Sequence, residues 1–161
     1  MTRRVAATLL LGALLFGGEA PALAPPPPPG GFSVTGQRDL RFQTVIAGIP
    51  TTVMWDSNQA GRWRLRGDAG SEVQLDFINL PTHLQNGVHL MPVSFSTTDA
   101  HWRSPGGGGE ATFDPAVGTT ARFGNSGQIF VYIGGTVIPP RAQQGGDYVA
   151  DIDLDVYYTG N

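Results

Sequence analysis

The chain has 161 residues, with 10 basic residues against 13 aspartates and glutamates, a net charge of −3 at pH 7. This balance argues against a nucleic-acid partner, which calls for a basic surface. The chain contains no cysteine, which excludes disulfides, thiolate chemistry and a lipoprotein anchor. Its 23 glycines and 13 prolines predict many turns and little helix.

The N-terminus has the pattern of a secretory signal peptide. Two arginines precede an apolar run over residues 5–18, and small residues follow at 20–24. A membrane-spanning helix needs roughly 20 apolar residues, so this run is too short for one. Cleavage after Ala22 is favoured over cleavage after Ala24, because Pro25 would lie beside the second scissile bond. The mature chain is therefore expected in the periplasm, at the cell surface or outside the cell, without a membrane span.

The chain divides into a signal peptide at 1–22, a Pro/Gly-rich spacer at 23–31 and one domain at 32–161. Five consecutive prolines at 25–29 favour a stiff polyproline II conformation and have no backbone N–H group, so they cannot form a central strand. Proline-rich segments also bind SH3-like domains, but in an exported chain we favour the spacer interpretation. The remaining length is typical of a single domain.

Beyond the spacer, apolar and polar residues alternate with a period of two, and no window sustains the 3.6-residue period of a helix. Strands are predicted at 32–34, 40–42, 51–55, 62–66, 72–77, 89–95, 128–138 and 148–158. Pro92 suggests an edge position for its strand, whereas apolar residues on both faces of 128–138 indicate a central strand. The glycine-rich stretch 97–110 has no pattern and is expected to be a long flexible loop.

The last predicted strand has the clearest alternation. Residues of one parity are expected to face the core: Tyr148, Ala150, Ile152, Leu154, Val156 and Tyr158. The other parity holds Asp151, Asp153 and Asp155, which are expected to face solvent. Short strands joined by turns rich in glycine and proline predict an all-β fold, an immunoglobulin-like β-sandwich.

The three aspartates also resemble the first ligands of an EF-hand loop. That loop needs a glycine at its sixth position, where this chain has Val156. We therefore interpret the aspartates as a solvated strand face, with a weak divalent-cation site as the alternative. The three histidines, His83, His89 and His101, are too scattered and lack acidic neighbours, so no metal site is predicted from them.

No other motif indicates catalysis or a cofactor. No serine lies in a Gly-x-Ser-x-Gly elbow, and the glycines at 106–109 lack the Lys and Ser/Thr of a phosphate-binding loop. Arg62, Arg64 and Arg66 share one strand face, opposite Trp63. We interpret this face as solvated and opposed to acidic residues on adjacent strands, rather than as a nucleic-acid strip. No catalytic, cofactor-binding or metal residues are predicted, and we expect the protein not to be an enzyme.

Two stretches resemble a known family. They read Phe32-Ser-Val-Thr-Gly-Gln-Arg-Asp-Leu-Arg-Phe-Gln-Thr-Val45 and Ile133-Gly-Gly-Thr-Val-Ile-Pro-Pro-Arg-Ala-Gln-Gln-Gly-Gly-Asp-Tyr148, the second followed by the alternating strand to Tyr158. They resemble the opening and the ending of the bacterial exported family catalogued as domain of unknown function 4402, which is similar to chaperone–usher fimbrial and coat subunits. Arg66-Gly-Asp-Ala-Gly-Ser-Glu-Val73 and Leu80-Pro81 resemble its middle. The sequence departs from the family at Gln43, where glycine is usual, over the short stretch 53–62, and at 25–31, which replace an alternating N-terminal extension.

The resemblance implies a function in surface assembly. Members are expected to be non-enzymatic structural subunits of a surface fimbria or coat used in cell adhesion, with an incomplete, pilin-like sandwich that a strand of another subunit completes. The implied partners are copies of the chain, related subunits and a periplasmic chaperone. The candidate donor strand contains Phe32 and Val34, and the candidate acceptor edge contains Ile152, Leu154, Val156 and Tyr158. The alternative is a monomeric exported binding module of immunoglobulin-like fold.

Overall fold

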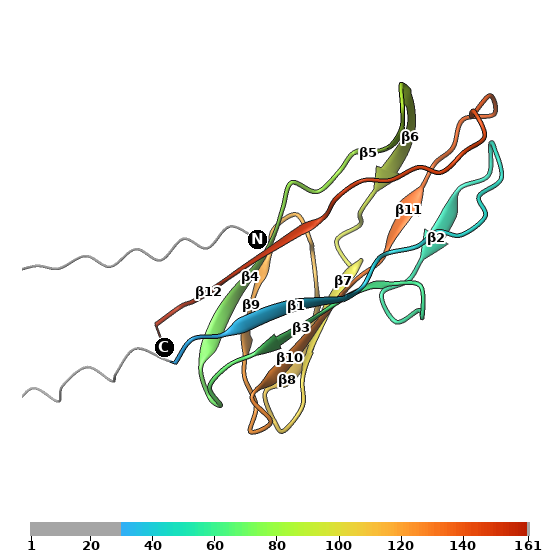
Figure 1. Cartoon of the computed structure of the whole chain (residues 1–161). Coiled ribbons are helices and arrows are strands. Elements are labelled where there is room, and N and C mark those ends of the chain that lie inside the picture. The colour runs from blue at the N-terminus through green and yellow to red at the C-terminus, as the bar shows by residue number, and fades with distance from the viewer. Residues whose placement is uncertain (1–29, 161) are drawn as a thin grey trace, which may run out of the picture.

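The computed structural model describes residues 30–160, so the predicted signal peptide and most of the spacer lie outside the described residues. The described part of the chain is all-β (Figure 1). Its strands are β1 (Ser33–Arg38), β2 (Thr51–Val53), β3 (Gly61–Arg66), β4 (Glu72–Ile78), β5 (His83–Asn86), β6 (His89–Ser94), β7 (Ala100–Ser104), β8 (Gly109–Phe113), β9 (Thr119–Arg122), β10 (Gln128–Ile133), β11 (Gly135–Val137) and β12 (Asp153–Tyr158).

Two antiparallel sheets form the main sandwich. The larger sheet has the order β1-β3-β10-β7-β8, and the smaller has the order β12-β4-β9. Every second residue of the central strands points between the sheets, so that Leu65 of β3, Val131 of β10 and Leu75 of β4 are fully buried. Each such side chain contributes about 1.5–3 kcal/mol of burial free energy. The predicted β-sandwich is therefore confirmed.

A third sheet, with the order β2-β11-β6-β5, extends the sandwich at one end. It has its own small hydrophobic core of Met91, Val93 and Val137. The predicted strand 128–138 is broken at Gly134, where a Cβ would lie 2.9 Å from the Trp55 amide nitrogen, and it contributes β10 to one sheet and β11 to another. Both halves are central strands, as the apolar residues on both faces predicted.

Two predictions about loops and edges are wrong. β6 is not an edge strand, since it lies between β11 and β5. Pro92 has no N–H group to donate, but this is tolerated because the missing group faces Ile138, just beyond the end of β11. The Ile138 N–H still donates to the Pro92 carbonyl (2.9 Å). The stretch 97–110 is not a flexible loop. It contains all of β7 and the start of β8, and Gly106 lies so close to Asn125 and Ser126 that a Cβ would meet their backbone nitrogens.

Two further strand predictions differ from the structure. The strand predicted at 40–42 is wrong, because these residues belong to no strand of the described chain, and β12 begins at Asp153 rather than at Tyr148. Within β12 the predicted faces are confirmed, because Asp153 and Asp155 are exposed and Val156 is buried. Tyr148 still points inward, whereas Ala150 is exposed.

The arginine face of β3 has different neighbours from those predicted. Arg66, Arg64 and Arg62 lie opposite Gln128, Phe130 and Tyr132 of β10 on one side and opposite Ser33, Thr35 and Arg38 of β1 on the other. None of these neighbours is acidic, so the predicted opposition to acidic residues is wrong. The reason is strand order, since the acidic strands β4 and β12 belong to the other sheet.

Candidate functional site

The two long sides of the sandwich are built differently. On one side β8 and β9, which belong to different sheets, lie against each other. On the other side β1 and β12 are the edges of their sheets and share no hydrogen-bond ladder within residues 30–160. They meet near the start of β1, where the rings of Phe32 and Tyr158 pack edge to face at 5.1 Å and the Tyr158 hydroxyl donates to the Gly30 carbonyl (3.0 Å).

From this meeting point the two chain segments diverge and border a groove. One rim is residues 36–47, which continue from β1, and the other is residues 143–153, which lead into β12 (Figure 1). The groove has a volume of about 1700 Å³. A small-molecule pocket usually measures about 300–1,000 Å³, so this groove has the size for a polypeptide segment.

Apolar side chains form much of the groove. The floor contains Trp63, Leu84, Met91, Val93, Phe95 and Val137, and the rims add Leu40, Phe42, Val45, Tyr148 and Ile152. All five rim residues, together with Trp63, Leu84 and Phe95 of the floor, are only half-buried. All of these except Leu40 pack against a hydrophobic core and also line the groove, so an apolar occupant would remove further surface from water.

Many backbone groups are unpaired in the part of each rim that lies beyond β1 or before β12. In the first rim the Arg41 amide donates to the Gln59 carbonyl (2.9 Å), but no other backbone–backbone hydrogen bond is present over described residues 40–45. In the second rim Val149 and Gln85 exchange two such bonds (2.8 and 3.0 Å), and residues 150–152 make none. Both rims therefore present N–H and C=O groups that a strand could pair with.

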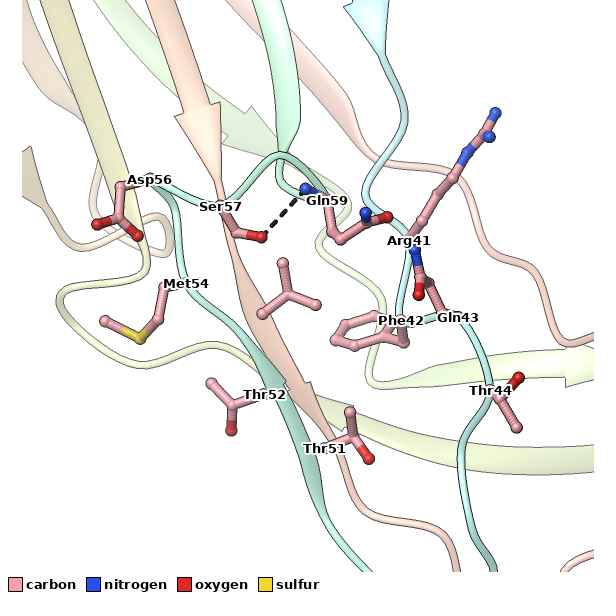
Figure 2. Close-up of a pocket in the computed structure, with 11 residues that line it drawn as sticks. Arg41, Phe42, Gln43, Thr44, Thr51, Thr52, Met54, Asp56, Ser57 and Gln59 are labelled. Atoms are coloured by element: carbon pink, nitrogen blue, oxygen red, sulfur yellow. Dashed lines mark hydrogen bonds between the residues drawn. The ribbon is translucent and has the colours of Figure 1, made fainter.

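A second, smaller pocket lies beside the first rim (Figure 2). It has a volume of about 470 Å³ and is lined by residues 41–44 and 51–59. In Figure 2 the Phe42 ring projects into this space. The Ser57 hydroxyl accepts a hydrogen bond from the backbone N–H of Gln59 (3.1 Å). Because residues 41–44 border an open space on both sides, few neighbours hold them in place.

The candidate donor residues lie in the chain's own sandwich. Val34 is opposite Leu65 in the β1–β3 ladder, and both Phe32 and Val34 pack against the main core. Sequence reasoning placed these two residues at the open side but missed the groove floor. Its residues come from two separate sheets and the segment after β6, and a local period of two does not show that they lie together.

The candidate acceptor edge lies along β12. Val156 is buried, while Ile152, Leu154 and Tyr158 are half-buried, and Ile152 lines the groove. Burial raises the pKa of the Tyr158 phenol, and its hydroxyl donates to the Gly30 carbonyl. The structure thus brings the candidate donor and the candidate acceptor edge together at one end of the groove.

A scan against protein-family models gives no match for this chain, and neither do searches of the curated proteins and of the solved structures. The resemblance to domain of unknown function 4402 therefore stays a prediction. Within residues 30–160, no three His, Asp or Glu residues are close enough together to hold a metal ion. That part of the chain also has no helix that could cross a membrane.

Proposed function

We propose that this chain is a non-enzymatic structural subunit of a bacterial surface fimbria or coat, and that its groove accepts an extended strand from another subunit. The observation that carries the proposal is the groove between β1 and β12, with unpaired backbone on both rims and half-buried apolar residues between them. In strand addition, backbone pairing supplies affinity and pockets for alternate side chains supply specificity.

The chain is better suited to accept a strand than to donate one. Its only alternating N-terminal residues, Phe32 and Val34, belong to a strand that already pairs with β3. The prolines at 25–29 have no N–H groups to offer a ladder. The donor is then a related subunit, or a second copy whose β1 has left its own sheet.

An unfilled groove also accounts for the remaining expectations. Open strand edges with exposed apolar side chains promote unwanted pairing, so such a subunit needs cover until it is assembled. The proposed signal peptide would export the chain, a periplasmic chaperone would supply the cover, and assembly at the cell surface would follow.

One observation favours the second candidate function, a monomeric exported binding module. The contact of Phe32 with Tyr158 already closes one end of the groove within a single chain. A self-contained module would use the remaining groove for a peptide that is not part of an assembly.

The proposal is tested by placing a charge in the groove. Leu84→Arg puts a guanidinium on the groove floor, and the matched control Leu90→Arg puts one on the opposite face of the same β5–β6 hairpin, where Leu90 is 51% exposed. In the cells that produce the chain, we expect the envelope fraction to contain high-mass species that resist unheated SDS. Leu84→Arg should abolish these species, and Leu90→Arg should retain them.

Two results would count against strand complementation. The chain could migrate as a monomer in every envelope sample, or Leu84→Arg could assemble as well as Leu90→Arg. If Leu84→Arg also fails to accumulate, thermal unfolding of both purified variants separates a lost fold from a lost interface.

A further inference from the structure

The outer face of the larger sheet is basic. Five arginines lie on this face, and Glu110 is the one acidic residue on its strands. The arginines are Arg38 of β1, Arg62, Arg64 and Arg66 of β3, and Arg103 of β7. Five arginines against one glutamate leave a net charge of +4 with His101 neutral. Within residues 30–160, none of the five arginines has a carboxylate oxygen within 4.0 Å.

One of these arginines, Arg62, is held over aromatic rings and is not paired with a carboxylate of the described residues. The Arg62 guanidinium lies over the Phe130 ring at 4.5 Å and near the Tyr132 ring at 5.7 Å, and its Nε is buried without a hydrogen-bond partner. Each guanidinium carries five donors in a plane, a geometry that matches carboxylates. This face therefore has donors in place and lacks an anionic partner.

The outer face of the smaller sheet is acidic. Asp76 of β4 lies directly opposite Asp155 of β12, and Asp153 follows on the same face. Glu72 adds a fourth carboxylate, and Arg122 is the one basic residue on the strands of this face, so the net charge is −3. Like charges directly opposite each other on neighbouring strands are destabilising. Asp76 accepts hydrogen bonds from the Gln74 side chain (2.7 Å) and the Tyr157 hydroxyl (3.2 Å), but within residues 30–160 no positive charge pairs with it.

We infer that the basic face of one copy docks on the acidic face of a second copy. The charges of +4 and −3 are complementary, and one contact gives both faces a counter-charge. A polyanion such as a sulfated polysaccharide would neutralise only the arginines and leave the acidic face without a counter-charge. Two of the charged residues, Arg38 and Asp153, also line the rims of the groove, so the test changes neither of them.

The position of the two faces fixes the form of the assembly. They lie on opposite sides of the sandwich (Figure 1), so each copy can bind one neighbour through each face. Such a heterologous contact does not close on itself and produces a stack of copies. Three strands of about six residues cover roughly 20 Å by 14 Å. This area is small for a stable interface, so a single contact is weak and salt-sensitive.

The test is a charge-swap experiment on residues 23–161, followed by sedimentation velocity over a series of protein concentrations. At about 20 mM salt we expect the sedimentation coefficient of the native chain to rise with concentration, and at about 500 mM salt to stay at the monomer value. The variant R64E/R66E has one neutral and one acidic face, and E72R/D155R, which leaves the groove rim unchanged, has two basic faces, so each alone should remain monomeric. Their equimolar mixture should associate again, which shows that both variants are folded. The control Arg141→Glu should behave as the native chain.

Several results would overturn the inference. The native chain could stay monomeric in low salt up to about 1 mM, the weak limit of specific association. The mixture could fail to associate, or the association could persist in R64E/R66E alone. If heparin shifts a native chain that is otherwise monomeric, the basic face binds a polyanion instead of a second copy. None of these outcomes bears on the groove, whose strand-filled form would resist both salt and SDS.

Discussion

The two long sides of the sandwich differ in burial although their sequences have the same alternation. At the β8/β9 side, Phe113 and Phe123 are 7% and 1% exposed. At the β1/β12 side, Val34, Ile152 and Leu154 have the same inward parity but remain half-buried. The difference arises because β8 and β9 cover each other, whereas no strand within residues 30–160 fills the space between β1 and β12.

Hydrogen bonds follow the same division. On the closed side the Ser104 hydroxyl donates to the Gln128 carbonyl (3.0 Å) and accepts from the Gly124 amide (2.8 Å), and the Asn125 amide donates to the Gly106 carbonyl (2.9 Å). On the open side, described residues 40–45 have a single backbone bond, from Arg41. The closed side therefore holds the fold, and the open side can gain a partner without losing bonds of its own.

The largest expected effect comes from removing a large side chain on each side. Phe123→Ala should lower the free energy of unfolding by about 3–5 kcal/mol, because the cavity is fully enclosed. Leu154→Ala should cost about 1–2 kcal/mol, since this side chain is only half-buried. Denaturant unfolding of both variants measures the difference, and equal losses would show that the open side is as closed in solution as the other.

A smaller effect is expected from adding a methyl group on each side. Gly108→Ala would push a Cβ into the Ser104 hydroxyl and the backbone of Arg122 and Gly124, which should cost about 1–3 kcal/mol. Gly145→Ala on the groove rim meets no atom within 4 Å and should be neutral or stabilising by about 0.4–1 kcal/mol. Thermal unfolding distinguishes the two. A loss at Gly145 similar to that at Gly108 would mean that the rim is tightly packed.

The smallest expected effect is a pH dependence of the free energy of unfolding that arises from His101 of β7. Burial beneath Trp55, whose ring stacks on His101 at 3.8 Å, lowers the pKa of His101; Glu110 opposes this shift and Arg103 adds to it. The unfolded chain therefore binds a proton more readily, so the His101 contribution is fully present above about pH 6.5 and declines as the pH falls toward the folded pKa.

The measurement is the melting temperature at pH 7.5 and at pH 5.5. His101→Gln should reduce the fall in melting temperature between pH 7.5 and pH 5.5. His83→Gln changes an exposed histidine and should leave that fall unchanged. An unchanged drop in His101→Gln would place the pH dependence elsewhere, for example in the carboxylates of the open side.

Much of the fold could be predicted from the sequence, because a period of two is a local property. The alternation of Val73, Leu75 and Phe77 identified β4 and its inward face, and the three aspartates identified the outward face of β12. β5, β7, β8 and β9 were missed because short strands next to glycine turns carry little pattern. The edge position inferred from Pro92 was wrong because the missing N–H falls where the β11 ladder ends.

The sequence by itself determined that this chain builds its core from alternating strands, which residues face that core, and that its N-terminal prolines cannot form a ladder. Only the tertiary structure decided which strands are neighbours. It left β1 and β12 apart with half-buried Ile152 and Leu154 between them, and it put the β3 arginines beside Phe130 and Tyr132 rather than beside carboxylates. Strand order depends on contacts between residues far apart in the chain, and a local period of two carries no information about it.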